Sequence, residues 1–244
     1  MIIDGYTTPG TQRETILSAA DLLQQMDDVG VERAVIAPED REIAVDHESG
    51  NNRMIKMARN SANRLIAACS VSPWHTDAPK KLAAAADRGA KMLVLAPMLQ
   101  GFIPADDLVR PLLEQVGELG LPVYFHTGPH TGGSPAQVAI VAEQHPKARF
   151  ILAHGGSTDH AWDMLAVLRH HALPNLWYEL SLVRPWSVPG YLELVGPNRL
   201  IFASSAPRND LGFELKQFDQ YVPVKDYPQI YGGNIAGLLE GSAT

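Results

Sequence analysis

The pattern of apolar and polar positions divides the chain into short apolar segments separated by amphipathic ones. Eight of the apolar segments have the length and the flanking turn residues of strands that are buried on both faces. They are residues 1–4, 33–38, 64–73, 91–97, 122–128, 149–156, 176–181 and 199–205. Strands of this kind are typical of a parallel sheet that helices cover on both sides.

The segments between these strands predict helices, so the repeating unit is a strand followed by a helix. The clearest helix covers SAADLLQQMDDVG, where Leu22, Met26 and Val29 share a face and Gly30 suits the left-handed position just past the end. Eight such repeats, with no GxGxxG in the first strand-to-helix turn, favour a closed barrel over an open doubly wound sheet. The sequence therefore predicts an α/β fold, a (β/α)8 TIM barrel that residues 1–244 form as a single domain.

Two histidines occupy the same position in their segments, each where an apolar run meets a glycine turn. His126 ends VYFHTG and His154 ends FILAHGG. In a barrel both would lie at the carboxyl-terminal rim, on neighbouring strands, where active sites of this fold are found. Alternation along the strands predicts that His126 shares the inward face with Tyr124, and that His154 shares it with Phe150 and Leu152. A structural, hydrogen-bonded role remains the alternative for each histidine.

Other polar residues are expected at the same rim. Glu179 is predicted to point inward, because a carboxylate packed against the helices would be costly, although it could serve only to fix a neighbouring loop. The expected acid and base groups are His126, His154, Glu179 and Tyr6. The residues expected to contact a substrate are Asp4, Trp74, His75, Gln100, Phe102, His130, Arg184, Ser205 and Arg208. The two arginines could bind a carboxylate in bidentate fashion or could brace loops.

Composition narrows the class of partner. Cys69 is the only cysteine, which excludes an intrachain disulfide and a cysteine-rich metal site. The formal net charge of −7, without a basic patch, argues against binding to nucleic acid or to an anionic membrane. Neither a membrane-spanning apolar run nor a signal peptide is visible. We expect a cytoplasmic protein that acts on a small-molecule substrate, with a homo-oligomer left open.

Several segments together resemble the amidohydrolase superfamily, specifically the amidohydrolase-related (amidohydrolase 2) branch that includes lactonases and metal-dependent decarboxylases. They are MIIDGYTT, QQMDDVGVERAVIAP, LQGFIPADDLVRPLLEQVGELGLPVYFHTG, FILAHGG, IFASSAP and GGNIAGLL, and they extend over nearly the whole chain. The resemblance implies a barrel with metal ligands at an HxH pair after strand 1, at single histidines after strands 5 and 6, and at an aspartate after strand 8.

This chain departs from that pattern at three of the five ligand positions. His126 and His154 are present, but Tyr6 and Thr8 stand in place of the HxH pair and Ser205 in place of the aspartate. A catalytic zinc normally needs about three protein ligands and an open position for water. We therefore expect no cofactor, and a weak or nonstandard divalent metal site that includes His126 and His154 is the alternative.

These observations support one functional hypothesis and two alternatives. The hypothesis is an enzyme acting on a small, carboxylated organic substrate by metal-free acid and base catalysis, through lactone or ester hydrolysis, isomerisation or cyclisation, or decarboxylation. The first alternative is a non-catalytic protein that kept the pocket and binds a small molecule. The second is a metal-dependent hydrolase with a nonstandard site. Barrels host many chemistries, so the fold does not decide between these hypotheses.

Overall fold

A computed structural model describes residues 1–12, 14–127, 133–154, 161–170 and 173–241. Its centre is an eight-stranded sheet in which every strand pairs in parallel with the next one along the chain. The strands are β1 (Ile3–Thr7), β4 (Arg33–Ile36), β5 (Leu65–Ser70), β6 (Met92–Leu95), β7 (Pro122–Phe125), β8 (Arg149–Leu152), β9 (Leu176–Glu179) and β10 (Leu200–Ile201). All eight strands lie within or beside the segments that the sequence predicts.

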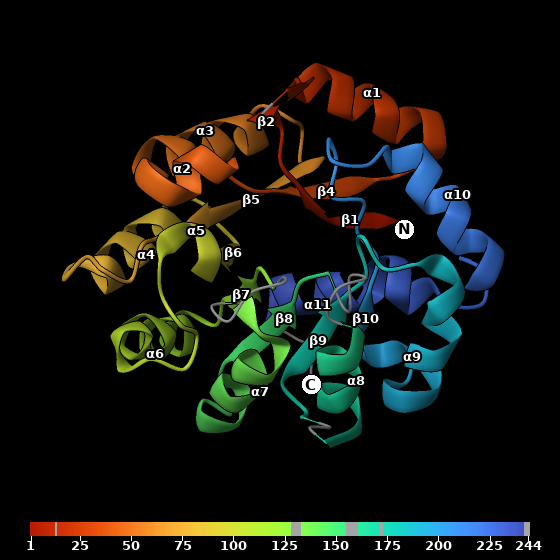
Figure 1. Cartoon of the computed structure of the whole chain (residues 1–244). Coiled ribbons are helices and arrows are strands. Elements are labelled where there is room, and N and C mark those ends of the chain that lie inside the picture. The colour runs from red at the N-terminus through yellow and green to blue at the C-terminus, as the bar shows by residue number, and fades with distance from the viewer. Residues whose placement is uncertain (13, 128–132, 155–160, 171–172, 242–244) are drawn as a thin grey trace.

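Backbone hydrogen bonds join the last strand to the first. The N–H of Gly5 donates to the carbonyl of Phe202 over 3.0 Å, and the N–H of Ser205 donates to the carbonyl of Tyr6 over 3.1 Å. Figure 1 shows the strands gathered around the centre of the molecule with the helices outside them. The expected α/β TIM barrel is confirmed, because the ring of parallel strands is closed by these bonds.

Helices cover the outside of this ring (Figure 1). They are α1 (Ala19–Val29), α2 (Asp40–Val45), α3 (His47–Arg59), α4 (Ala78–Asp87), α5 (Pro97–Gln100), α6 (Arg110–Leu119), α7 (Pro135–Gln144), α8 (Ala161–His170), α9 (Val188–Val195), α10 (Leu211–Tyr221) and α11 (Asn234–Glu240). Helix α1 follows the sequence prediction: Ser18 caps its first turn, and Gly30 ends it in the left-handed conformation with a φ of 74°. No helix in the described ranges is long and apolar enough to cross a membrane.

The barrel interior has its own apolar cluster, separate from the layer between sheet and helices. Alternate strand residues enter this interior cluster, and Ile235 and Leu238 of α11 join it together with Ile3, the first residue of β1, and Ile201 of the two-residue strand β10. Helix α11 therefore closes the amino-terminal end of the barrel, as its place behind the strands in Figure 1 indicates. The opposite end of the barrel, at the carboxyl-terminal ends of the strands, is where a site can form.

A short hairpin, which the sequence pattern does not predict, follows β1. Strands β2 (Gly10–Gln12) and β3 (Thr15–Leu17) pair antiparallel. Arg53 holds the base of the hairpin by donating to the carbonyl of Pro9 over 2.8 Å while it pairs with Glu39 and Glu42 over 2.8 and 2.6 Å. Gly10 has a φ of 140°, and a Cβ there would lie 2.5 Å from Oε1 of Glu39, so only glycine fits beside this ion-pair network.

Candidate active site

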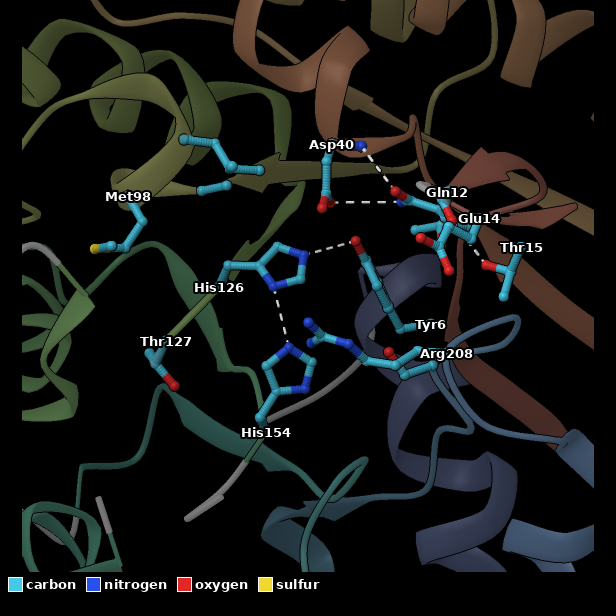
Figure 2. A pocket seen from close by; sticks show the side chains of 14 residues that line it. Tyr6, Gln12, Glu14, Thr15, Asp40, Met98, His126, Thr127, His154 and Arg208 are labelled. Atoms are coloured by element: carbon cyan, nitrogen blue, oxygen red, sulfur yellow. Dashed lines mark hydrogen bonds between the residues drawn. The ribbon is translucent and has the colours of Figure 1, made fainter. Parts of the chain in front are cut away.

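A cavity of about 710 Å³ opens at the carboxyl-terminal ends of the strands. This is the rim where the sequence pattern expects a site. Figure 2 shows a histidine pair near its centre, with side chains of the hairpin and of α2 on one side. The lining residues are Tyr6, Thr8, Gln12, Glu14, Thr15, Asp40, Ala96, Met98, Leu99, His126, Thr127, His154, Ser205 and Arg208.

Three of these side chains form a continuous hydrogen-bond chain along the wall (Figure 2). The hydroxyl of Tyr6 lies 2.6 Å from Nε2 of His126. On the other side of the ring, Nδ1 of His126 lies 3.1 Å from Nε2 of His154. The two histidines and the tyrosine that the sequence nominates as acid and base groups are therefore in direct contact at one cavity.

The chain continues into the protein behind the cavity wall. Nδ1 of His154 lies 2.8 Å from Oγ of Ser181, and Ser181 in turn donates to Oε2 of Glu179 over 3.0 Å. Glu179 is completely buried and does not line the cavity. It also accepts from the hydroxyl of Tyr124 over 2.8 Å and from the backbone N–H of His154 over 2.9 Å. Glu179 thus acts on the site through His154 and Ser181. Strand alternation predicts an inward position for Ser181, but Ser181 is not among the residues that the sequence nominates for the site.

His154 reaches the cavity by a route that strand alternation does not predict. Phe150 and Leu152 pack in the layer between sheet and helices, whereas Ile151 and Ala153 face the barrel interior, so the predicted inward face of this strand is wrong. Strand β8 ends before His154, whose φ of 56° turns the backbone out of the strand. This left-handed conformation costs roughly 1–2 kcal/mol in a residue other than glycine. The bond from the His154 N–H to Glu179 helps to hold it.

Tyr6 faces the cavity because β1 is irregular. Its pairing with β4 shifts register between Asp4 and Thr7, as in a β-bulge. As a result Ile3 and Tyr6, three residues apart, both enter the interior cluster. The ring of Tyr6 then stacks on that of Tyr124, with centroids 4.4 Å apart and planes 5° from parallel. This stacking fixes the direction of the Tyr6 hydroxyl toward His126.

Burial keeps His126 and His154 uncharged at neutral pH. It lowers the pKa of His126 to about 3, with His154 adding to the effect. It also lowers the pKa of His154 to about 3, with the Arg208 guanidinium adding to it. Burial raises the pKa of the Tyr6 hydroxyl well above its ordinary value. The members of the chain that line the cavity are therefore neutral, and each imidazole can offer one N–H and one lone pair.

Charged residues line the mouth around this neutral chain. In Figure 2 the Arg208 side chain extends toward the two imidazoles. Asp40 and Glu14 also line the cavity, and Asp40 contacts Gln12 through bonds of 3.4 and 3.5 Å that tie the hairpin to α2. Sequence reasoning missed these hairpin and α2 residues. For Asp40 a signal existed, because it follows the end of a predicted strand, but the hairpin had no distinct pattern.

Only part of the set that the sequence nominates for substrate contact lies at the cavity. Ser205 and Arg208 line it, but the following six residues do not: Asp4, Trp74, His75, Gln100, Phe102 and Arg184. His130 lies outside the described residues.

Local contacts explain where these six side chains go. Phe102 is buried in the core, and Gln100 binds the backbone N–H of Ala96 over 2.9 Å. Trp74 and His75 are exposed, and Trp74 donates to the carbonyl of Gln100 over 2.9 Å. Arg184 is exposed, with its guanidinium carbon 5.3 Å from the centre of the Trp186 ring.

Asp4 is fully buried and braces the junction between the first and last strands. It accepts from the hydroxyl and the backbone N–H of Ser204, the latter over 2.9 Å, and from the backbone N–H of Tyr6 over 3.2 Å. Burial raises the pKa of Asp4 to about 7. Asp4 therefore holds the backbone of Tyr6 rather than facing a ligand.

A family model described as Amidohydrolase matches residues 9–240. The chain belongs to the amidohydrolase family. No curated protein matches this amidohydrolase. Solved structures do, at sequence identities that show the fold alone.

Three of those structures show how closely the fold is shared. The manganese-bound 5-carboxyvanillate decarboxylase of Novosphingobium aromaticivorans has a TM-score of 0.81 at 12% identity, with 98% of this chain and 97% of that chain covered. A 2,6-dihydroxybenzoate decarboxylase with its dihydroxybenzoate has a TM-score of 0.78 at 15% identity, covering 98% and 99%. The 4-oxalomesaconate hydratase of Rhodopseudomonas palustris has a TM-score of 0.75 at 17% identity, covering 99% and 96%.

The described side chains at the mouth of this amidohydrolase do not form a ready set of ligands for a divalent metal. Among the described residues, no group of three or more histidine, cysteine, aspartate or glutamate side chains is placed to hold one. Both ring nitrogens of His126 and both of His154 already take part in hydrogen bonds. Glu179 and Asp4, which could complete a nonstandard site, are each surrounded by donors. Metal binding would have to break this network before it gained a ligand.

Proposed function

We propose that this amidohydrolase is an enzyme that acts on a small, carboxylated organic molecule by acid and base catalysis without a tightly held metal. The observation that carries the proposal is the continuous contact from Tyr6 through His126 to His154 along the cavity wall. Neutral imidazoles and a phenol at hydrogen-bonding distance can relay a proton, because each group passes on one proton as it takes up another and so stays neutral. A cavity of this size suits a small organic molecule.

Arg208 is the proposed anchor for the carboxylate of the substrate. Its guanidinium extends toward the imidazoles (Figure 2). A substrate carboxylate bound there in bidentate fashion would place the carbon next to the carboxylate beside the hydrogen-bond chain. The relatives with solved structures include enzymes named for aromatic carboxylic acids, which supports a substrate of this class. Lactone or ester hydrolysis, isomerisation or cyclisation, and decarboxylation all use such a site.

The test is a turnover screen with lactones, aryl esters and hydroxybenzoic acids, on protein purified without chelator. His126→Gln and His154→Gln should each abolish the activity found while the far-ultraviolet circular dichroism spectrum is kept. Full activity in both variants would refute the proposed roles. Saturable binding of an acid without turnover, and tolerance of both replacements, would favour a non-catalytic binding protein. Activity that needs about one bound manganese, zinc or iron per chain would favour a metal-dependent hydrolase with a nonstandard site.

A further inference from the structure

The hydrogen-bond chain from Tyr6 to Glu179 has a direction. A neutral imidazole donates from one ring nitrogen and accepts at the other, and a hydroxyl has one proton to donate. Once one member of the chain is fixed as donor or acceptor, the roles of its neighbours follow. The tautomer of His154 therefore determines that of His126, because their rings meet between Nε2 and Nδ1 at 3.1 Å.

The hydrogen bonds at the Glu179 end of this hydrogen-bond chain cannot easily reverse their direction, because the groups around Glu179 are donors. The backbone N–H of Ser181 donates to Oε1 over 2.5 Å, and the backbone N–H of His154 donates to Oε2 over 2.9 Å. Tyr124 adds its hydroxyl on Oε2 over 2.8 Å. These donors stabilise the carboxylate form, which can only accept.

Ser181 passes this constraint to the histidines. Because its hydroxyl donates to Glu179, its oxygen is free only to accept, and the N–H of His154 must then be on Nδ1, 2.8 Å away. Nε2 of His154 is then an acceptor, so His126 must also carry its proton on Nδ1. Nε2 of His126 is left as a lone pair that points at the Tyr6 hydroxyl, 2.6 Å away.

We propose that Ser181, together with the Glu179 carboxylate, is a positioning residue that holds both histidines in the Nδ1–H tautomer and so presents Tyr6 to the cavity as a proton acceptor. The inference rests on the proposed function, since it assigns the direction of proton transfer at the same site. The Tyr6 proton is directed to His126, so the lone pairs of the phenol oxygen face the substrate.

The proton balance of such a step follows from the chain. A proton leaves the substrate and binds the Tyr6 oxygen, while the Tyr6 proton moves to Nε2 of His126. The Nδ1 proton of His126 moves to Nε2 of His154, and the Nδ1 proton of His154 moves to Oγ of Ser181. The Ser181 proton moves to Glu179. The substrate becomes an anion, Glu179 becomes a neutral acid, and every group between them stays neutral.

Glu179 suits this role because it is completely buried behind the cavity wall, where its carboxylate can only accept hydrogen bonds. The direction of these hydrogen bonds in the free protein also distinguishes between the reaction types that the proposed function leaves open. Removal of a proton comes first in an isomerisation, in a cyclisation and in hydrolysis by an activated water. Decarboxylation instead requires a proton to be delivered to carbon. The structure therefore favours isomerisation, cyclisation or hydrolysis over decarboxylation for this protein.

Nuclear magnetic resonance of the free, full-length protein tests the inference without any substrate. In protein labelled with 15N at the imidazoles, couplings from the ring nitrogens to the carbon-bound protons distinguish the two neutral tautomers. The signals of His126 and His154 are assigned because each is missing from the spectrum of its own variant, His126→Gln or His154→Gln. We expect both to be Nδ1–H at pH 7. An Nε2–H or a doubly protonated ring at either position would overturn the proposal.

Ser181 variants test the positioning role. Ser181→Ala removes the hydroxyl that lies 2.8 Å from Nδ1 of His154, and Oε2 of Glu179 at 3.6 Å is too far to replace it, so the Nδ1–H signals of both histidines should weaken together. Ser181→Thr keeps a hydroxyl and should restore them. Tyr124→Phe is the matched control, because it removes another donor to Oε2 that lies outside the chain, and it should leave both tautomers unchanged.

The outcomes are separable from those of the turnover screen. Unchanged tautomers in Ser181→Ala, or a change in only one histidine, would refute the role of Ser181 even if the protein is an active enzyme. Predicted tautomers in a protein without turnover would refute the proposed function alone. If Ser181→Ala does not fold, the wild-type tautomers and Ser181→Thr still decide the direction of the chain.

Discussion

Nδ1 of His126 lies 3.1 Å from Nε2 of His154, so the two histidines contact each other directly through their ring nitrogens. The outer nitrogen of each is also engaged, by Tyr6 on one side and by Ser181 on the other. This arrangement uses every nitrogen lone pair and N–H of the pair within the protein. In the proposed mechanism it serves as a neutral path for a proton.

Removal of the Tyr6 hydroxyl should reduce turnover without preventing folding. Tyr6→Phe keeps the stacking on Tyr124, so the fold should survive, while turnover should fall by about 10²- to 10⁴-fold, as for the loss of an acid or base group. The measurement is kcat with any substrate from the screen. Tyr231→Phe is the comparison, because its hydroxyl binds the carbonyl of Val222 far from the cavity, and it should cost only about 1 kcal/mol of stability. Equal activity of the two variants would contradict this prediction.

The two arginines should differ in their effect on substrate binding. Arg208→Gln should raise KM, since losing hydrogen bonds to a charged group costs about 1.5–3 kcal/mol, or roughly 10- to 150-fold. Arg184→Gln should leave KM unchanged, because Arg184 stacks on Trp186 and does not line the cavity. Steady-state kinetics with one carboxylated substrate measure both. A larger effect from Arg184 would show that the described cavity is not where the acid binds.

The contribution of His126 and His154 to the stability of the protein should fall as the pH is lowered from 6.5 toward 4. Their pKa values are lowered from 6.5 to about 3, so the unfolded chain binds more protons than the folded one in this range. Asp4 and Glu214 oppose this, because their pKa values are raised from 3.8 and 4.5 to about 7 and their folded forms take up protons there. Each histidine by itself contributes a slope of about 1.4 kcal/mol per pH unit.

Urea unfolding at several pH values measures this slope. His126→Gln removes one of the two histidine contributions, so the slope of its unfolding free energy against pH should be lower than that of the wild type by about 1.4 kcal/mol per pH unit between about pH 4.5 and 6. A variant as steep as the wild type would show that His126 is not buried in its neutral form.

Chelation should have little effect on this amidohydrolase. Because both nitrogens of each histidine are hydrogen-bonded, we expect far less than one manganese, zinc or iron per chain by elemental analysis. Dialysis against EDTA should leave the melting temperature and the activity unchanged. One equivalent of metal, with activity lost on dialysis and regained on its return, would establish a metal-dependent hydrolase with a nonstandard site.

The barrel could be predicted from the sequence because its signal is local and repeated. Apolar strands, helices such as α1 and a glycine after the helix each report on a few neighbouring residues, and eight repeats reinforce one another. The placement of His126 and His154 at one rim follows from that repeat. The hairpin at β2 and β3 was missed, because its short alternation is too weak to separate it from a loop.

The sequence by itself determined the ring of strands and the places of His126 and His154 at its rim, because both depend on periodicity along the chain. Only the tertiary structure decided which rim residues touch. A register shift in β1 turns Tyr6 inward, a left-handed residue at 154 brings its ring to the cavity, and Ser181 meets His154 across strands. Each depends on contacts between residues far apart in the chain, and the local sequence pattern carries no information about such contacts.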